Sequence, residues 1–516
     1  MKRYSILFSL SLLFLSLSFM GCTDLEENVI DEQLGGDLVY NPSNVQALIH
    51  PPYASLRQLI EWYDYWGLQQ ITTDETVFPT RGTDWFDNGA WQQLHLHTWN
   101  ADHIRLQNVW DMMSRGVFRA NTAMYYISLF EQNATTEQYI NEARFLRAYY
   151  MYTFIDLWGK VPFRPADQLD FKVTPVVLEG KEAVDFIIEE IKHVLPNLKT
   201  RSEVGTERVT QGAAHALLAK LYLNYEVYGG ETKWTETITH CNELITSGDY
   251  EVTEDYWSMF QKDVTDDHPE FILTVPMSDE VEMGGGSVWI NFTLHYHQGF
   301  GNYNSLWNGG STTSTFVDTW DQDNDARFYD DRIMSETGFN QGFLMGQQYG
   351  VNGEALEMRN GNPLIFVPTI VLNDSPENYG VRVIKFAPNP DTERQFSSPN
   401  DVPLLRISDI YLTRAEAKFR DGDEDGALED INFIRSRRSA EGKVLPELTV
   451  LTLDDILDER GFELYWEGFR RQDLIRFGKY TNAWQEKPVT SATKSLFALP
   501  TSAVSVNENL KQNDGY

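Results

Sequence analysis

Residues 407–434 read ISDIYLTRAEAKFRDGDEDGALEDINFI and contain two helical patterns separated by a short turn. In each pattern, apolar and small side chains recur at the spacing of one helix face. These positions are Ile410, Leu412, Ala415 and Ala417 in the first pattern and Ala427, Leu428, Ile431, Phe433 and Ile434 in the second. Asp421-Gly422-Asp423 lies between them and combines a helix-stop glycine with helix-start acids. The stretch therefore predicts two antiparallel helices, the second beginning near Glu424.

Small residues at the helix crossing, and a unit of about 34 residues, resemble a tetratricopeptide repeat. On spacing alone, a generic helical hairpin explains the pattern equally well. A second helix-rich stretch covers 104–248 and supports a helical scaffold in either case. Further helices are predicted at 184–198, 211–228 and 234–246. We therefore expect an all-α fold of tetratricopeptide-like hairpins in one domain, 41–516, with helices mainly in 104–248 and 405–480 and minor β structure.

One helix of this scaffold has recognisable signals at both ends. Thr135 and Gln138 have the spacing of a capping box. Phe145, Tyr149 and Tyr152 follow at i, i+4 and i+7, which places them on one helix stripe. Gly159 then gives the expected stop. The pattern predicts a long amphipathic helix that begins near Thr135 and ends at Gly159.

Two other stretches, 62–100 and 275–400, show no sustained period and are rich in Gly, Asn, Thr, Trp and Tyr. A short strand is predicted within 363–372, where β-branched apolar residues gather. Irregular stretches of this length inside a domain usually carry function. We expect the ligand loops of the protein here.

The N-terminus has the order of an export signal. Basic residues at 2 and 3 precede an apolar run shorter than the ~20 residues that span a bilayer, and Gly21-Cys22 follows. This order predicts a lipoprotein signal peptide at 1–21 with Cys22 as the lipidated residue. A plain secretory signal with an incidental cysteine is the alternative. Residues 22–40 are acidic and poor in apolar side chains, which predicts an extended tether; a segment folded back along the body is equally compatible.

The formal net charge is −34, which disfavours nucleic acid and anionic lipid as partners. The chain has two cysteines, Cys22 and Cys241. With Cys22 lipidated, no internal disulfide can form, so burial of apolar surface must stabilise the fold. No second apolar run of transmembrane length is present in the sequence.

The densest aromatic and polar cluster runs from Thr73 to Trp99 and includes Asp74, Arg81, Trp85, Asp87, Trp91, His95, His97 and Trp99. Indole faces stack on the C–H faces of sugar rings, and charged side chains hydrogen-bond the hydroxyl edges. The cluster therefore indicates a glycan platform, although tryptophans are as often core residues. Trp289, after the glycine run 284–286, and Trp307, before Asn308-Gly309-Gly310, are further candidates because glycines leave an indole face open. Turn chemistry is the alternative there.

The sequence gives little support for a metal site or for catalytic residues. In 321–332, Ala326 and Arg332 stand where an EF-hand needs Gly and Glu. His95 and His97 would share one face of a strand but lack a third ligand for zinc. Glu459, Glu463 and Glu467 alternate with arginines, which indicates a structural ion-pair network rather than a glycosidase pair. We therefore expect no enzyme, no metal and no cofactor.

Several stretches together resemble the SusD/RagB family of Bacteroidetes outer-membrane lipoproteins. They occur in family order and cover essentially the whole chain from Cys22 to Tyr516. They are EARFLRA (142–148), LWGKVPF (157–163), GAA to LLAKLYL (212–223), YLTRAEA (411–417), ER with ELYWEGFR (459–470), DLIRFG (473–478) and the closing segment LP to QNDGY (499–516).

The resemblance implies a non-catalytic, surface-exposed glycan-binding lipoprotein, lipid-anchored to the outer membrane, that loads a SusC-like TonB-dependent transporter. Asp74, Trp99 and Trp307 match positions that bind sugar in the family's starch-binding prototype. The aromatic residue expected beside Gly284 is absent, and Trp289 is the candidate to replace it. Arg81 and Trp85 are predicted from their chemistry alone. The predicted ligand is an oligo- or polysaccharide; a peptide- or protein-binding helical scaffold on the same membrane is the alternative, because some family members take peptides.

Overall fold

The structure is a computed structural model that describes residues 44–168, 172–265, 267–278, 285–392 and 399–516. It divides into two compact units, residues 1–46 and 47–516, and only three residues of the first unit are described. The predicted signal peptide, Cys22 and the tether lie outside the described residues. In the part that is described, no helix is both long and apolar enough to cross a membrane. The larger unit, residues 47–516, contains both the helical scaffold and the predicted ligand loops.

The described chain is mostly helical, with 47 % of residues in helices and 11 % in strands, which confirms the predicted fold class. The helices are α3 (Val45–Ala54), α4 (Tyr65–Gln70), α5 (Ala90–His95), α6 (Ile104–Ser128), α7 (Ala134–Trp158), α8 (Gly180–Val194), α9 (Arg201–Val204), α10 (Gln211–Leu223), α11 (Tyr225–Gly229), α12 (Trp234–Ser247), α13 (Gly285–Thr293), α14 (Ser314–Val317), α15 (Met334–Thr337), α16 (Ile407–Asp421), α17 (Glu424–Arg437), α18 (Leu453–Leu464), α19 (Arg470–Arg476) and α20 (Thr501–Val506).

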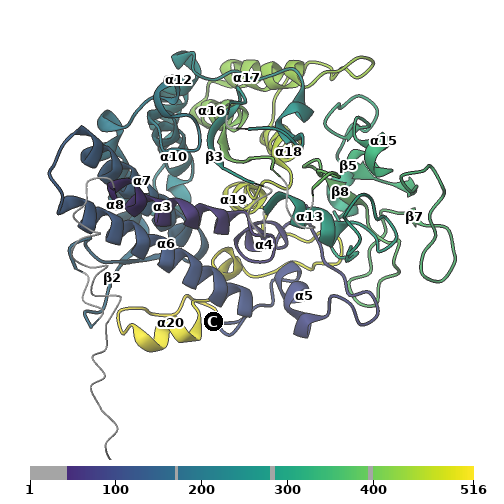
Figure 1. The fold of residues 1–516 in the computed structure, drawn as a ribbon, viewed down its shortest axis with the longest axis horizontal. Helices are drawn as coiled ribbons and strands as arrows, with labels where there is room; N and C mark the ends of the chain where they lie inside the picture. Colours follow the sequence, from purple (N-terminus) through teal and green to yellow (C-terminus); the bar gives the residue numbers. More distant parts are fainter. Residues whose placement is uncertain (1–43, 169–171, 266, 279–284, 393–398) are drawn as a thin grey trace, which may run out of the picture. The chain divides into compact units, whose positions relative to one another are not determined.

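Consecutive long helices pack on one another, α6 on α7, α7 on α8, α10 on α12 and α16 on α17. The pair α16–α17 is the hairpin predicted from residues 407–434. Gly422 ends α16 in a left-handed conformation (φ 93°), and the Asp423 side chain caps α17 by accepting a hydrogen bond from the Gly426 N–H at 3.0 Å. Since α12 also packs on α16, the two helical stretches of the sequence form one scaffold (Figure 1).

The start of α7 differs from the prediction by two residues. Asn133, not Thr135, is the N-cap, and its Oδ1 accepts hydrogen bonds from the N–H groups of Thr135 and Thr136. The Thr136 hydroxyl in turn accepts a hydrogen bond from the Asn133 N–H. Asn is among the best N-cap residues, so it takes the place that the Thr-x-x-Gln spacing indicated. The helix ends before Gly159 (φ 67°), as predicted.

Among the described residues, the β structure consists of short strands in four small sheets. They are β1 (Lys160–Phe163) with β2 (Val176–Glu179), β3 (Phe271–Val275) with β9 (Val402–Arg406), β4 (Tyr329–Asp330) with β5 (Gln341–Leu344) and β8 (Arg382–Ile384), and β6 (Gly346–Gln347) with β7 (Ile365–Phe366), all antiparallel. The strand expected within 363–372 is only Ile365–Phe366. The loop-rich segment after residue 300, green in Figure 1, lies to the side away from α7 and α8.

Two isolated β-bridges join the predicted ligand loops. Val77 pairs with Ser311, and Thr312 pairs with Val381. The first bridge fastens the segment before Trp85 to the segment that follows Trp307, and the second joins the latter to Val381, beside β8. Residues far apart in sequence are thereby placed around one surface pocket.

Candidate functional site

An open pocket of about 690 Å³ lies where these loops meet. Its volume is within the range of small-molecule sites. Six aromatic and four charged side chains line it: Trp62, Tyr63, Trp85, Trp91, Tyr296, Trp307, Asp84, Asp87, Arg105 and Arg359. We call it the aromatic pocket.

The backbone between Trp85 and Asn88 is held in a conformation that side chains other than glycine rarely adopt. Trp85, Asp87 and Asn88 have φ of 64°, 40° and 56°. Each such residue costs on the order of 1–3 kcal/mol, and surrounding contacts must stabilise it. The Trp85 carbonyl accepts from Gln92 Nε2 at 3.2 Å, and Asp87 accepts a hydrogen bond from Trp91 Nε1. Local strain of this kind is concentrated at functional sites.

Trp85 and Trp307 form the pair of indoles at the pocket wall. Both are half-buried, their ring centroids are 6.4 Å apart, and their planes are inclined by 50°. Trp85 Nε1 donates to the backbone carbonyl of Trp307 at 2.7 Å. Behind them lies Trp62, which contacts both rings and the core residue Phe292. The wall is therefore anchored to the core while its outer surface stays accessible.

Gly309 makes room for the Trp85 indole. A Cβ atom at Gly309 would lie inside van der Waals contact with the Trp85 ring. We therefore expect Gly309→Ala to displace Trp85 and to weaken ligand binding about tenfold or more, with only a modest loss of stability. The check is ligand titration by tryptophan fluorescence together with thermal unfolding; unchanged affinity would contradict the role of Trp85. Gly248→Ala (φ 77°, no atoms nearby), at the end of α12, is the control for a glycine substitution away from the pocket.

Arg81 supports the pocket from behind. It is 2 % exposed, and its Nε donates to the Asn308 carbonyl at 2.7 Å. Its other nitrogens donate to the carbonyls of Pro376 and Tyr379 and to the Ser311 hydroxyl. Burial lowers the pKa of Arg81 to about 10. Arg81 therefore fixes the turn after Trp307, and it is not among the residues that line the pocket.

Three further lining residues, Tyr296, Arg359 and Asp84, interact with one another and with Glu377, and we call these four residues the clasp. The Tyr296 hydroxyl donates to Asp84 at 2.6 Å, and the Arg359 guanidinium lies 4.1 Å above the Tyr296 ring. Arg359 is also ion-paired with Glu377 through its Nε and lies 3.5 Å from Asp84. His295 contacts Glu377 at 3.1 Å, and burial lowers the pKa of His295 to about 4. The clasp sets the orientation of Tyr296.

Two other predicted site residues, Asp74 and Trp99, lie outside the aromatic pocket. Asp74, 9 % exposed, forms a bidentate ion pair with Arg470, with both N–O distances 2.8 Å. Trp99, 1 % exposed, packs on Phe497 and donates from Nε1 to the Tyr516 hydroxyl at 2.6 Å. Neither side chain has a free face or edge for a ligand in this structure, because each is enclosed by its own partners.

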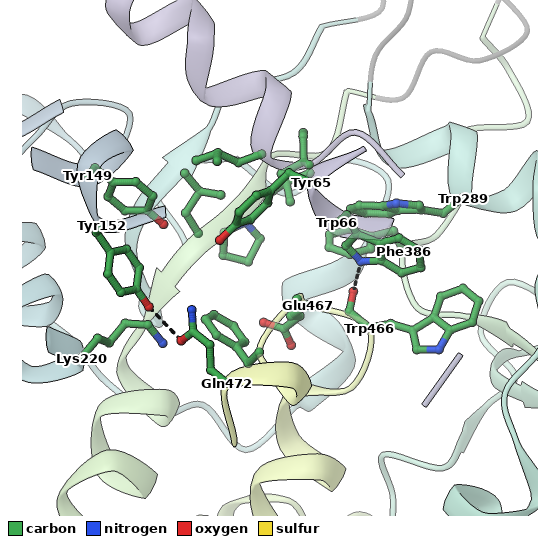
Figure 2. Close-up of a pocket in the computed structure, with 17 residues that line it drawn as sticks. Tyr65, Trp66, Tyr149, Tyr152, Lys220, Trp289, Phe386, Trp466, Glu467 and Gln472 are labelled. Carbon is green, nitrogen blue, oxygen red and sulfur yellow. Dashed lines mark hydrogen bonds between the residues drawn. The ribbon is translucent and has the colours of Figure 1, made fainter. Parts of the chain in front are cut away.

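A third predicted site residue outside the aromatic pocket is Trp289, which lines a separate inner cavity with Trp66, Phe386 and Trp466 (Figure 2). The volume of this cavity is about 50 Å³, which is enough for one or two water molecules and too small for a sugar ring. One polar pair at this cavity is already satisfied, since the Tyr152 hydroxyl donates to Gln472 at 2.8 Å. Trp289 therefore does not replace the missing aromatic residue at the aromatic pocket.

Of the predicted residues, then, Trp85 and Trp307 come together in the aromatic pocket. The sequence prediction missed Trp62, Tyr63, Asp84, Arg105, Tyr296 and Arg359 as lining residues. The aromatic run that contains Tyr63 was a usable signal. Asp84 lies beside Trp85 inside the predicted cluster, whereas Arg105, Tyr296 and Arg359 come from separate segments with no common pattern, so only the fold brings these three to the pocket.

The predicted strand geometry of His95 and His97 is wrong. His95 is the last residue of α5, and His97 has a φ of 56°. His95 contacts the Gln485 carbonyl at 2.9 Å, and His97 contacts the Thr72 carbonyl at 2.8 Å. Among the described residues, no group of three or more His, Cys, Asp and Glu side chains is placed to hold a metal ion.

A third pocket, of about 460 Å³, lies between residues 254–257, 326–332 and 439–443. Its charged groups pair with one another: Arg332 contacts Asp255 at 2.9 Å and Asp330 at 2.8 Å. The Tyr329 ring is covered by the Lys443 ammonium at 5.2 Å. Three aromatic side chains line this third pocket, whereas six line the aromatic pocket.

The aromatic pocket combines ring faces with polar groups. Asp84 accepts a hydrogen bond from the Tyr296 hydroxyl, and Asp87 accepts one from Trp91 Nε1. Aromatic faces with acceptor and donor groups at their edges suit a ligand with apolar ring faces and a hydroxyl rim.

Comparison with known proteins gives two family matches. Residues 246–516 match the family model described as the SusD family, and residues 39–223 match the one described as starch-binding associating with outer membrane. The starch-binding protein SusD of Bacteroides thetaiotaomicron is 26 % identical over 495 residues, which cover 87 % of this chain and 84 % of that protein.

Solved structures share the fold. A SusD superfamily protein from Parabacteroides distasonis has a TM-score of 0.73 at 22 % identity, covering 92 % of this chain and 99 % of the other. A laminarin-binding SusD-like protein has a TM-score of 0.72 at 19 % identity, covering 92 % and 100 %.

Proposed function

The chain belongs to the SusD family, and from this premise we propose that it is a non-catalytic glycan-binding lipoprotein of the outer membrane. The aromatic pocket is its glycan site. The observation that carries the proposal is the half-buried pair Trp85 and Trp307, which borders an open pocket of suitable volume.

The relatives support a saccharide as the ligand class. One is named a starch-binding protein, and a structural neighbour is described as laminarin-binding. Both ligands are neutral polysaccharides whose rings have an apolar face. The open mouth of the pocket suits a segment of a longer chain, because both ends of the oligosaccharide can leave it.

The remaining parts of the proposal concern location and partner. Cys22 carries the lipid, the protein faces the cell exterior, and captured oligosaccharide passes to a SusC-like TonB-dependent transporter. The basis is the order of residues 1–22 and the family described as associating with the outer membrane.

Affinity electrophoresis tests the binding function directly. The protein without residues 1–21 is run in native gels that contain starch, laminarin, xyloglucan or galactomannan, with bovine serum albumin as the non-binding control. We expect at least one of these neutral polysaccharides to retard the protein. If none does, while an immobilised peptide library captures it, the proposal is wrong and the peptide-binding alternative replaces it.

A further inference from the structure

We infer that the aromatic pocket selects uncharged glycans and discriminates against chains that carry uronate or sulfate groups. The inference rests on the proposed function and adds the charge class of the ligand. Two cationic side chains line the pocket among the described residues, and both are already engaged by carboxylates and rings of the protein. Two carboxylates, Asp84 and Asp87, line the pocket as well.

The first cation, Arg105, is engaged on three sides. Its guanidinium lies 4.7 Å from the Trp91 ring centroid and 5.1 Å from the Tyr63 ring centroid. Its NH1 is 3.5 Å from Asp64 Oδ1, and Asp64 is largely buried beneath it. An anionic ligand would have to compete with Asp64 for this guanidinium, which is itself in contact with both rings.

The second cation, Arg359, belongs to the clasp. Its Nε pairs with Glu377, its backbone N–H donates to the same carboxylate at 3.0 Å, and its NH2 approaches Asp84. The hydrogen bond from Arg359 to Glu377 raises the pKa of Arg359, so the group stays charged and paired. A ligand carboxylate that recruited Arg359 would have to draw it away from Glu377 and from the Tyr296 ring.

Carboxylates are in excess around the pocket once the ion pairs are counted. Asp64 pairs with Arg105 and Glu377 pairs with Arg359, so among the described residues the two lining carboxylates, Asp84 and Asp87, have no cation of their own to balance them, and Glu61 adds a further carboxylate beside Tyr63. The whole chain has a formal net charge of −34, which adds a repulsive background. A hydroxyl group can donate to these oxygens, whereas a ligand carboxylate or sulfate can only accept.

Simple electrostatics gives the size of the effect. One unpaired like charge at roughly 7 Å from a ligand anion, in a solvent-exposed pocket, weakens binding by roughly threefold to tenfold. Added salt reduces this penalty, since exposed charges are screened over about 10 Å at 0.1 M. Discrimination should therefore be strongest at low ionic strength.

The test uses three forms of the neutral polysaccharide that retards the protein most strongly. The first is unmodified, the second has a fraction of its C6 hydroxyls oxidised to carboxylates, and the third has those carboxylates converted to uncharged amides. We expect the oxidised form to bind about tenfold more weakly than the other two at about 20 mM salt, and the gap to narrow at about 300 mM. Affinity is measured by isothermal titration calorimetry or by gel retardation.

Asp87→Asn supplies the test on the protein side. Asparagine tolerates the positive φ of this position and retains an acceptor for Trp91 Nε1. We expect the variant to bind the oxidised form better relative to the amide form than the wild type does. The inference is overturned if the oxidised form binds as well as the amide, or if the amide binds as weakly as the oxidised form. If no form of any neutral polysaccharide binds, the proposed function itself fails and the inference with it.

Discussion

Trp307→Ala is expected to abolish retardation by any polysaccharide that retards the wild type, with a fall in affinity of about 30-fold or more. Buried aromatic anchors at the centre of an interface commonly contribute about 2 kcal/mol or more to binding. Trp307 supplies one of the two inclined indole faces of the aromatic pocket. The Trp85 Nε1 hydrogen bond goes to the backbone carbonyl of residue 307, so alanine retains it. The loss should therefore reflect the missing ring rather than a displaced Trp85.

Trp99→Ala is the matched control, because it removes the same side chain from a buried site. Trp99 packs on Phe497 and donates to the Tyr516 hydroxyl, so its loss should destabilise the fold by about 3–5 kcal/mol. Glycan affinity of the protein that remains folded should stay near that of the wild type. Circular dichroism melts and affinity gels measure the two effects separately. The opposite result, binding lost with Trp99 and kept without Trp307, would place the glycan site elsewhere.

The contrast between these tryptophans shows where sequence reasoning stops. Trp85, Trp99 and Trp307 have similar neighbours in sequence, rich in polar and small residues. An indole stacks as well on a core phenylalanine as on a sugar ring, so residue type alone does not separate the two roles. Whether an indole can contact a ligand depends on its burial in the folded protein. The burial of Trp99 depends on partners as distant in sequence as Tyr516. The same holds for Asp74, whose partner Arg470 is 396 residues away.

The scaffold was far more predictable, because its signals are local. Periodicity and the turn at Asp421 to Asp423 predicted the hairpin α16–α17 without information from elsewhere in the chain. The start of α7 was misplaced by two residues since Asn133 and Thr135 are both competent caps. The pocket rim had no such signal. Tyr296 and Arg359 reach it through loops whose course is set by long-range contacts.

The buried network around Glu463 gives the second large effect. Glu463 contacts Arg327 at 3.0 Å, Arg406 at 2.5 Å and Arg438 at 2.7 Å, and all four side chains are buried. We expect Glu463→Gln to destabilise the fold by about 3–5 kcal/mol, because three buried guanidinium groups would lose a shared counter-ion. Denaturant midpoints at neutral pH measure the loss. Glu254→Gln, which breaks an exposed pair with Arg437, should change little.

The pH dependence of stability gives an independent check on Glu463. Burial alone would raise the pKa of this carboxyl group, but Arg438 and Arg406 outweigh it and hold the pKa well below its usual value. When folding lowers the pKa of a carboxyl group, the group stabilises the folded state at pH values above its unfolded pKa, which is about 4.3 for Glu. This stabilisation is lost as the pH falls toward the folded pKa. Wild-type stability should therefore fall below about pH 5, whereas that of Glu463→Gln should fall less steeply. If the stability of the two proteins fell equally steeply with pH, the charge of Glu463 would not stabilise the network. The alternation of Glu459, Glu463 and Glu467 with arginines would then need another explanation.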